Sequence, residues 1–179
     1  MSDPLRIDLP LTRAAARSLR AGQVVELFGE MYTARDAAHQ RLIELIDSGG
    51  ELPIDLADIT IYYVGPTPAP PGAPIGSAGP TSSYRMDPYT PELIARGQTG
   101  MIGKGPRGEG VLAAMREHGA VYFAAVGGAA ALIARAIKSY EIVAYEDLGA
   151  EALARITVEG FPCIVAQDSV GGDLYQHQK

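Results

Sequence analysis

Hydrophobic positions change their spacing along this chain, and the changes predict strands alternating with helices. Ala38, Leu42 and Leu45 recur at helical spacing and predict a helix over residues 34–47, with Thr33 as its N-cap. β-Branched and aromatic residues predict a strand over residues 58–64. Further strands are predicted over residues 6–9, 24–28, 120–126, 141–145 and 161–166, and further helices over residues 13–19, 90–97, 129–137 and 151–155, with one more helix ending at His118. This alternation is typical of α/β architecture with an at least partly parallel sheet.

A segment rich in proline and glycine interrupts this pattern. Residues 65–80 contain too much proline for a helix or a central strand, so they are predicted to form a loop. A flexible linker would explain this composition. The residues that follow directly, 81–90, carry more polar groups than a linker needs. We therefore favour an ordered loop that leads into a site.

Length and charge narrow the classes of function. The 179 residues are typical of one globular domain, here covering residues 1–179. The net charge is −6 and the basic residues are scattered, so nucleic acid is not an expected partner. The sequence contains neither an apolar stretch long enough to span a membrane nor the pattern of a signal peptide. We therefore expect a cytoplasmic protein that does not contact membranes.

Few residues are available for metal or thiol chemistry. Cys163 is the one cysteine of the chain, which rules out an internal disulfide and a multi-thiolate metal site. Its apolar surroundings predict a buried hydrophobic residue, not a nucleophile. His39, His118 and His177 are far apart and have no evident partners, so the sequence supports no histidine-based mechanism. A metal held by thiolates must sit mainly on another chain.

Lysine is much rarer than arginine in this chain, and Lys104 lies between two glycines. Gly105 stands where a phosphate-binding loop requires serine or threonine, which disfavours nucleotide binding. A glycine turn followed by a helix N-terminus nevertheless exposes N–H groups that suit a carboxylate or a phosphate. A plain tight turn with a solvated lysine explains the pattern equally well.

Two arginines are further candidates for binding an anion. Arg85 follows several hydroxyl residues, and a guanidinium can bind a carboxylate through two parallel hydrogen bonds. A surface ion pair with Asp87 is the alternative, and it is slightly favoured. Arg35 stands at the predicted start of a helix, where a cation opposes the helix dipole, so an anion is expected nearby. A surface arginine whose stem covers apolar groups is an equal alternative.

Five segments of the chain together resemble one known family. They are MYTARDAAHQRL, YYVGPTPAPPG, IGSAGPTSSYRMDPYTPELI, GMIGKG and HGAVYFAAVGGAAALIA, and they follow the family's order over nearly the whole chain. The family is that of the class I iron–sulfur hydro-lyases, which includes fumarases and tartrate dehydratases. The chain is similar to their β subunit or C-terminal domain. Because five separate segments agree in order, the resemblance is specific.

The resemblance implies a swivelling β/β/α-type single domain whose active site forms against a cysteine-bearing α subunit. That partner holds a 4Fe-4S cluster through three cysteines. The resemblance further implies that Thr81 is the catalytic base and that Arg35, Arg85 and Lys104 bind the substrate. A threonine hydroxyl is a weak base near neutral pH, so Thr81 requires activation by a neighbouring base, a metal or a strongly cationic site.

The resulting hypothesis is the β subunit of an enzyme that reversibly hydrates a C4 dicarboxylate, with fumarate to malate as the first candidate. A tartrate dehydratase or a hydratase of a methylated diacid is an alternative, because the chain departs from the family's pattern at residues 82–84 and 106–107. A non-catalytic anion-binding or assembly module is the alternative from another class. The chain alone is expected to be inactive and can self-associate through the surface meant for its partner.

Overall fold

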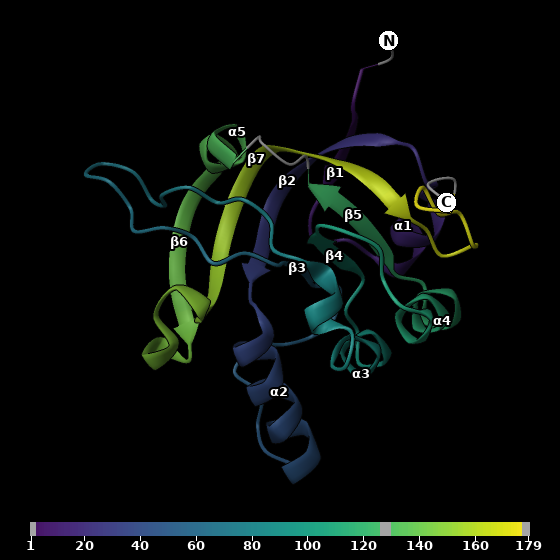
Figure 1. The fold of residues 1–179 in the computed structure, drawn as a ribbon, viewed down its shortest axis with the longest axis horizontal. Helices are drawn as coiled ribbons and strands as arrows, with labels where there is room; N and C mark the ends of the chain where they lie inside the picture. Colours follow the sequence, from purple (N-terminus) through teal and green to yellow (C-terminus); the bar gives the residue numbers. More distant parts are fainter. Residues whose placement is uncertain (1–2, 126–129, 177–179) are drawn as a thin grey trace.

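One mixed sheet forms the centre of the molecule in the computed structural model, which describes residues 3–125 and 130–176. Within these residues the sheet has seven strands in the order β1-β2-β3-β4-β5-β7-β6 (Figure 1). The strands are β1 (Leu5–Asp8), β2 (Val24–Thr33), β3 (Thr60–Tyr62), β4 (Gly100–Gly103), β5 (Val121–Ala125), β6 (Ile137–Ala144) and β7 (Leu153–Gln167). The prediction of an α/β fold with a partly parallel sheet is confirmed.

The sheet closes on itself. β7 runs antiparallel to β5 and also pairs with β2, so β2, β3, β4, β5 and β7 form a five-stranded barrel. β1 and β6 extend the sheet on the outer sides of β2 and β7. The neighbouring pairs from β1 to β5 are all parallel. Because parallel strands end on the same side, the chain leaves β2, β3 and β4 at one common edge.

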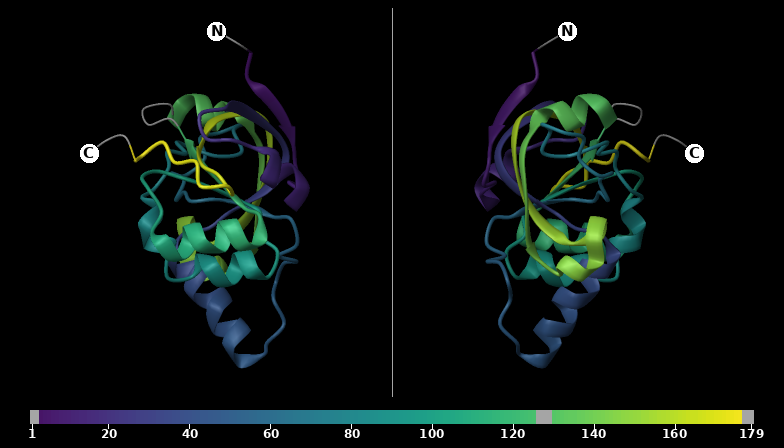
Figure 2. Two further views of the ribbon diagram at one scale, coloured as in Figure 1. Left: turned by 90° about the vertical axis from the view of Figure 1, so that its right-hand side faces the viewer. Right: turned by 90° about the vertical axis from the view of Figure 1, so that its left-hand side faces the viewer.

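Helices cover the two ends of the barrel. α2 (Asp36–Ser48), α3 (Thr90–Ala95) and α4 (Glu109–His118) lie together near one end, whereas α5 (Ala130–Ala136) lies at the other (Figures 1 and 2). The remaining helical segments are α1 (Arg13–Ser18), η1 (Ser83–Met86) and η2 (Glu146–Glu151), of which η1 and η2 are 3-10 turns. In the residues that the structure covers, no helix is long and apolar enough to cross a membrane.

Strand alternation divides the buried side chains between two cores. Successive residues of a strand point to opposite faces, so Tyr62 and Phe123 face the barrel interior, whereas Tyr63 and Tyr122 face the helices. The interior core includes Leu27, Met31, Ile102 and Val165, and the outer core includes Leu42, Ile61, Met101 and Met115. The outer core therefore fixes α2, α3 and α4 against the strands whose ends converge.

Several predicted elements need correction. Residues 151–155, predicted as a short helix, mostly belong to β7, since η2 ends at Glu151. Their local preference is overridden by pairing with β2, which includes Thr33 opposite Ala154. The same pairing extends β2 well past residue 28, so Arg35, and not Thr33, is the N-cap of α2. The predicted strand end at 126, the break after it and the helix start at 129 lie outside the described residues.

The proline-rich segment is ordered, as the favoured interpretation predicted. The Thr67 N–H donates to the Ser77 carbonyl over 3.0 Å, which closes the outward excursion of the loop. The buried Tyr62 hydroxyl donates to the Ala78 carbonyl and ties the returning chain to β3. Ile75 is buried in the interior core. The loop therefore leaves the sheet and returns to the end of β3 at a defined place.

Candidate functional site

The four candidate site residues lie near one edge of the sheet. Arg35 follows β2 and Lys104 follows β4, both at carboxyl ends of parallel strands. Thr81 returns from the proline-rich loop, and its N–H donates to the carbonyl of Tyr63 over 2.9 Å, just past β3. Ser82 forms a parallel bridge with Lys104. Segments that are distant in sequence thus bring the backbones of these residues to one edge of the sheet.

A chain of buried hydroxyls shapes the turn that carries Lys104. The Lys104 N–H donates to Ser83 Oγ over 3.0 Å, and the Lys104 carbonyl accepts from the Ser83 N–H over 2.9 Å. Ser83 Oγ lies 2.7 Å from the Tyr122 hydroxyl, which donates to the Gly105 carbonyl. Burial raises the pKa of Tyr122, so its hydroxyl stays a neutral donor. Gly103 is required here, because a Cβ would collide with Ser83 Oγ.

Arg85 and Lys104 are the exposed cations of this edge. Neither forms an ion pair with any residue in the described part of the chain. The alternative of an Arg85–Asp87 pair is wrong, because Asp87 Oδ1 accepts from Arg107 Nε over 2.8 Å. Arg85 therefore leaves its guanidinium in solvent, two residues from Ser83, which contacts the Lys104 turn.

Arg107 is a buried structural cation that the sequence analysis treated only as a departure from the family's pattern. Its side chain is fully buried, and beyond Asp87 it donates to the hydroxyls of Tyr63 and Thr90, each over 2.9 Å. Burial opposes its charge, but Tyr63 and Asp87 outweigh this effect and raise the pKa of Arg107. Its contacts connect the ends of β3, η1 and α3 beneath the exposed edge.

The N-terminus of the helix that follows Lys104, which was predicted to bind an anion, already contacts a carboxylate of the same chain. α4 begins at Glu109, and the Gly108 N–H at its N-cap donates to Asp87 Oδ2 over 2.9 Å. The chain's own carboxylate therefore accepts one N–H at this helix start, and binding of a further anion beside Lys104 stays a prediction. The exposed side chain of Lys104 is what the turn offers to a ligand.

Arg35 is held more tightly than the other two cations. Its Nε lies 3.3 Å from Glu151 Oε1, and 24% of its side chain is exposed. The Arg35 side chain packs directly against Gly65, since a Cβ at position 65 would lie 2.7 Å from Arg35 Nη1. The anion expected near Arg35 is thus Glu151 of the same chain. Within residues 3–125 and 130–176, the terminal guanidinium nitrogens of Arg35 have no hydrogen-bond partner.

His39 is a buried polar residue that the sequence analysis set aside. Its Nδ1 lies 2.7 Å from the Arg35 carbonyl, and its ring meets Tyr63 edge-on, with centroids 5.5 Å apart. Nε2 is buried without a hydrogen-bond partner among the residues described. Desolvation by burial lowers the pKa of His39 to about 4, so the ring is neutral near pH 7. The spacing of four residues from Arg35 in a predicted helix was the available signal.

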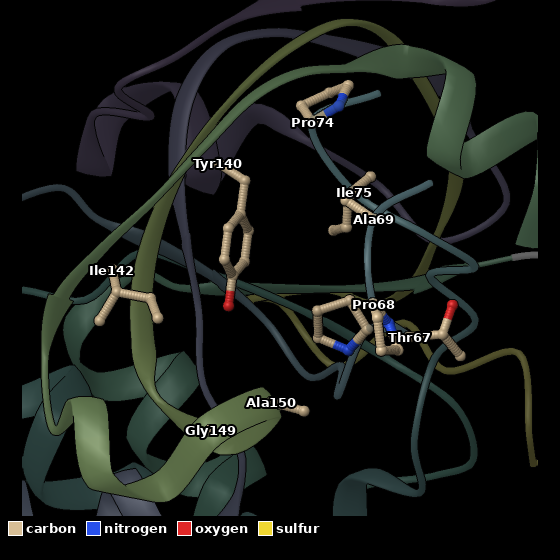
Figure 3. A pocket seen from close by; sticks show the side chains of 10 residues that line it. Thr67, Pro68, Ala69, Pro74, Ile75, Tyr140, Ile142, Gly149 and Ala150 are labelled. Carbon is tan, nitrogen blue, oxygen red and sulfur yellow. The ribbon is translucent and has the colours of Figure 1, made fainter. Parts of the chain in front are cut away.

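A cavity of about 230 Å³ lies between β6 and the proline-rich loop, as Figure 3 shows from close by. Tyr140 and Ile142 of β6 line one side, and Pro68 and Ile75 of the proline-rich loop line the other (Figure 3). Its walls also include Pro66 and Ala150, the sequence neighbours of the two residues that contact Arg35. These walls are mainly apolar, so the charged edge, and not this cavity, is the candidate anion site.

The described residues do not fit a metal cluster. Cys163 faces the interior core at 2% exposure, and burial raises the pKa of its thiol well above the usual value. No group of three histidine, cysteine or acidic side chains in the described ranges could hold a metal ion. The prediction that Cys163 is a buried hydrophobic residue is confirmed. A cluster bound by three thiolates would need another chain to hold it.

Comparison with known proteins identifies relatives of this chain. The "Fumarate hydratase class I, anaerobic" of Escherichia coli is 44% identical over 154 residues, which are 85% of this chain and 28% of that protein. The "Putative L(+)-tartrate dehydratase subunit beta" of Methanocaldococcus jannaschii is 38% identical over 93% of this chain and 88% of its own length. The "Putative fumarate hydratase class I" of Geobacillus stearothermophilus is 34% identical over 96% of this chain.

The length of the match differs between these relatives. The chain spans only about a third or less of the fumarate hydratases, but nearly all of the tartrate dehydratase subunit. A family model described as "Fumarase C-terminus" matches residues 2–178. The resemblance drawn from the five sequence segments is confirmed, and the chain belongs to the Fumarase C-terminus family.

Proposed function

We propose that this chain is the β subunit of an iron–sulfur hydro-lyase that reversibly hydrates a C4 dicarboxylate, with fumarate to malate as the first candidate. The observation that carries the proposal is the exposed edge where Thr81 lies with Arg35, Arg85 and Lys104. A C4 dicarboxylate has two carboxylates to bind, and the edge offers three cations. The names of the fumarate hydratase relatives support the reaction class.

The proposed roles follow from the chemistry of each side chain. Arg85, with its planar guanidinium in solvent, binds one carboxylate through two parallel hydrogen bonds. Lys104 and the terminal nitrogens of Arg35 stabilise the second carboxylate and the negative charge that develops when the adjacent carbon loses a proton. Thr81 Oγ1 accepts that proton and returns it in the reverse direction.

Thr81 needs activation for this role. No hydrogen bond to its side-chain hydroxyl is found in the ranges that the structure describes, so no histidine or carboxylate of those ranges activates it directly. The cationic edge lowers the cost of a negative charge on the oxygen, and a group from the partner can complete the activation. The proposal therefore needs a second chain at this edge.

The 4Fe-4S cluster is proposed to lie on that second chain. The single buried cysteine of this chain does not fit a cluster site. A cysteine-bearing α subunit would hold the cluster through three thiolates. The roles given to Thr81 and the three cations do not depend on its geometry. The proposal also includes a swivelling β/β/α-type domain over residues 1–179 and a cytoplasmic location.

Tartrate dehydration is a second candidate reaction. It is favoured by the Methanocaldococcus jannaschii relative, which is named a tartrate dehydratase subunit beta and matches this chain over 88% of its length. Tartrate and malate both carry a hydroxyl next to a carboxylate, so the same cations would bind either. The two reactions are separated by assay and not by the fold.

The experiment that tests the proposal is purification of the chain from its host without oxygen. We expect an iron-containing, cysteine-bearing partner to copurify, with turnover of fumarate, tartrate or both. The relative rates name the substrate. A chain that purifies alone, colourless and inactive, from a host that encodes no such partner would replace the proposal with the non-catalytic binding module.

A further inference from the structure

We propose that His39 is a positioning residue that holds Arg35 and the end of β3 in the geometry that the site requires. The inference rests on the proposed function, because it assigns a purpose to the placement of Arg35. His39 does not reach the exposed edge itself, since its side chain is completely buried. It acts through the residues that it contacts.

The first contact is with the backbone of Arg35. The Arg35 carbonyl accepts the backbone N–H of His39 over 3.0 Å and lies 2.7 Å from His39 Nδ1. With a proton on Nδ1, both donors come from one residue. Arg35 has extended backbone angles, φ −117° and ψ −168°, and no side chain caps this end of α2. The imidazole therefore fixes the peptide from which the Arg35 side chain departs.

The second contact is with Tyr63, at the end of β3. The imidazole packs edge-on against the phenol ring, and the Tyr63 carbonyl accepts the N–H of Thr81. The buried ring thus contacts the Arg35 carbonyl directly and reaches Thr81 only through Tyr63. Its other nitrogen, Nε2, has no hydrogen-bond partner in the described part of the chain. An apolar side chain that filled this space would avoid the cost of burying that nitrogen.

The tautomer follows from these contacts. A carbonyl can only accept, so the hydrogen bond to Arg35 requires the proton on Nδ1. Nε2 is then an unprotonated acceptor, buried with no donor among the described residues. This makes a direct prediction for the folded chain: His39 is locked as the Nδ1–H tautomer, and its ring proton exchanges slowly with water.

Two amide variants separate positioning from packing. His39→Asn places an NH₂ near the position of Nδ1, where it can still donate to the Arg35 carbonyl. His39→Gln is closer to histidine in volume but places its NH₂ near the position of Nε2. If His39 only fills space, Gln is the better replacement. If the hydrogen-bond donor at the Nδ1 position matters, Asn is the better replacement.

The kinetic test uses the complete enzyme, assembled with its iron–sulfur partner without oxygen. Because Arg35 is proposed to bind a carboxylate already in the ground state, its misplacement raises KM, and the loss of its contribution to the developing charge also lowers kcat. We expect His39→Gln to raise KM roughly tenfold and His39→Asn to stay within about threefold of the unmodified enzyme. Equal KM values for the two variants, or a lower one for Gln, would overturn the proposal.

A second readout needs no enzyme activity. In ¹⁵N-labelled chain, NMR should show the slowly exchanging Nδ1–H of His39. His39→Gln should shift the backbone signals of residues 34–36 and of Thr81, whereas His39→Asn leaves them in place. Absence of the ring proton refutes the positioning role even in an active enzyme. Its presence in a chain whose assembled complex has no hydratase activity refutes the proposed function and leaves the hydrogen bond established.

Discussion

At the residue scale, the proton transfer proposed for Thr81 is tested by removing its hydroxyl. Thr81→Val keeps the shape of the side chain and loses the oxygen. We expect turnover to fall by roughly 10²- to 10⁴-fold, the usual contribution of an acid or base in the site. Assembly with the partner should be unchanged, because the backbone N–H that bonds to Tyr63 remains. Thr81→Ser is the matched control, and near-normal turnover in Thr81→Val would remove Thr81 from the mechanism.

Arg85 is exposed and has no acidic partner in the described residues, so its guanidinium is available to a ligand. Arg85→Lys keeps the charge but loses the planar pair of donors. We expect kcat/KM to fall roughly 10- to 100-fold, in line with the loss of one charge-assisted hydrogen bond. The control is Arg96→Lys, since Arg96 forms an exposed pair with Glu92 on α3. Equal kinetics in both variants would show that Arg85 does not bind substrate.

His39 makes the stability of the fold depend on pH. Its pKa is about 4 in the folded chain against 6.5 in the unfolded chain. Between these values the unfolded chain binds the additional proton, so stability falls as the pH falls from 6.5 to 4. The full effect is about 3 kcal/mol. Denaturant unfolding at pH 7 and pH 4.5 should show a larger loss for the unmodified chain than for His39→Asn. Equal losses would contradict the low pKa.

At the scale of elements, Arg107 holds together the segments beneath the site. Its guanidinium contacts Asp87 after η1, Tyr63 after β3 and Thr90 of α3. Arg107→Met removes these bonds and leaves polar groups without partners. We expect a loss of about 3 kcal/mol of unfolding free energy, because Arg107 is buried while Asp87 stays partly exposed to water.

Denaturant unfolding of Arg107→Met beside Arg96→Met provides the comparison. Arg96 and Glu92 pair with similar geometry, at 2.8 Å, but both are about half exposed. The second variant should therefore cost less than about 1 kcal/mol. Similar losses in the two variants would show that the buried network adds nothing beyond a surface ion pair.

For the whole molecule, the exposed cations and the missing thiolates indicate an incomplete site. We expect the isolated chain to unfold cooperatively, yet to hydrate no fumarate above background. Addition of the cysteine-bearing subunit with its cluster should restore turnover. The isolated chain should also self-associate with rising concentration, as sedimentation would measure, and the partner should suppress this. Turnover by the chain alone would refute the dependence on a partner.

The sequence identified the candidate residues better than it identified their surroundings. Arg35, Thr81, Arg85 and Lys104 were named from motifs, and their placement at one edge follows from the parallel order of β2, β3 and β4. The pairing of Asp87 with Arg107 was missed, because Arg85 is nearer in sequence and equally charged. Burial decided between them: Arg107 would be costly to bury without Asp87, whereas Arg85 stays in water.

Local pattern alone determined the α/β class, the ordered proline-rich loop, the buried Cys163 and the need for another chain to hold thiolate-bound metal. Composition and short-range spacing are sufficient for these, since each depends on residues close in sequence. Tertiary structure decided that β7 closes the barrel, that Asp87 occupies the N-terminus of α4, and that His39 lies under Arg35. Those outcomes depend on partners far apart in the chain or on burial. Local preferences of a fraction of a kcal/mol per residue cannot outweigh strand pairing and the cost of an unpaired buried charge.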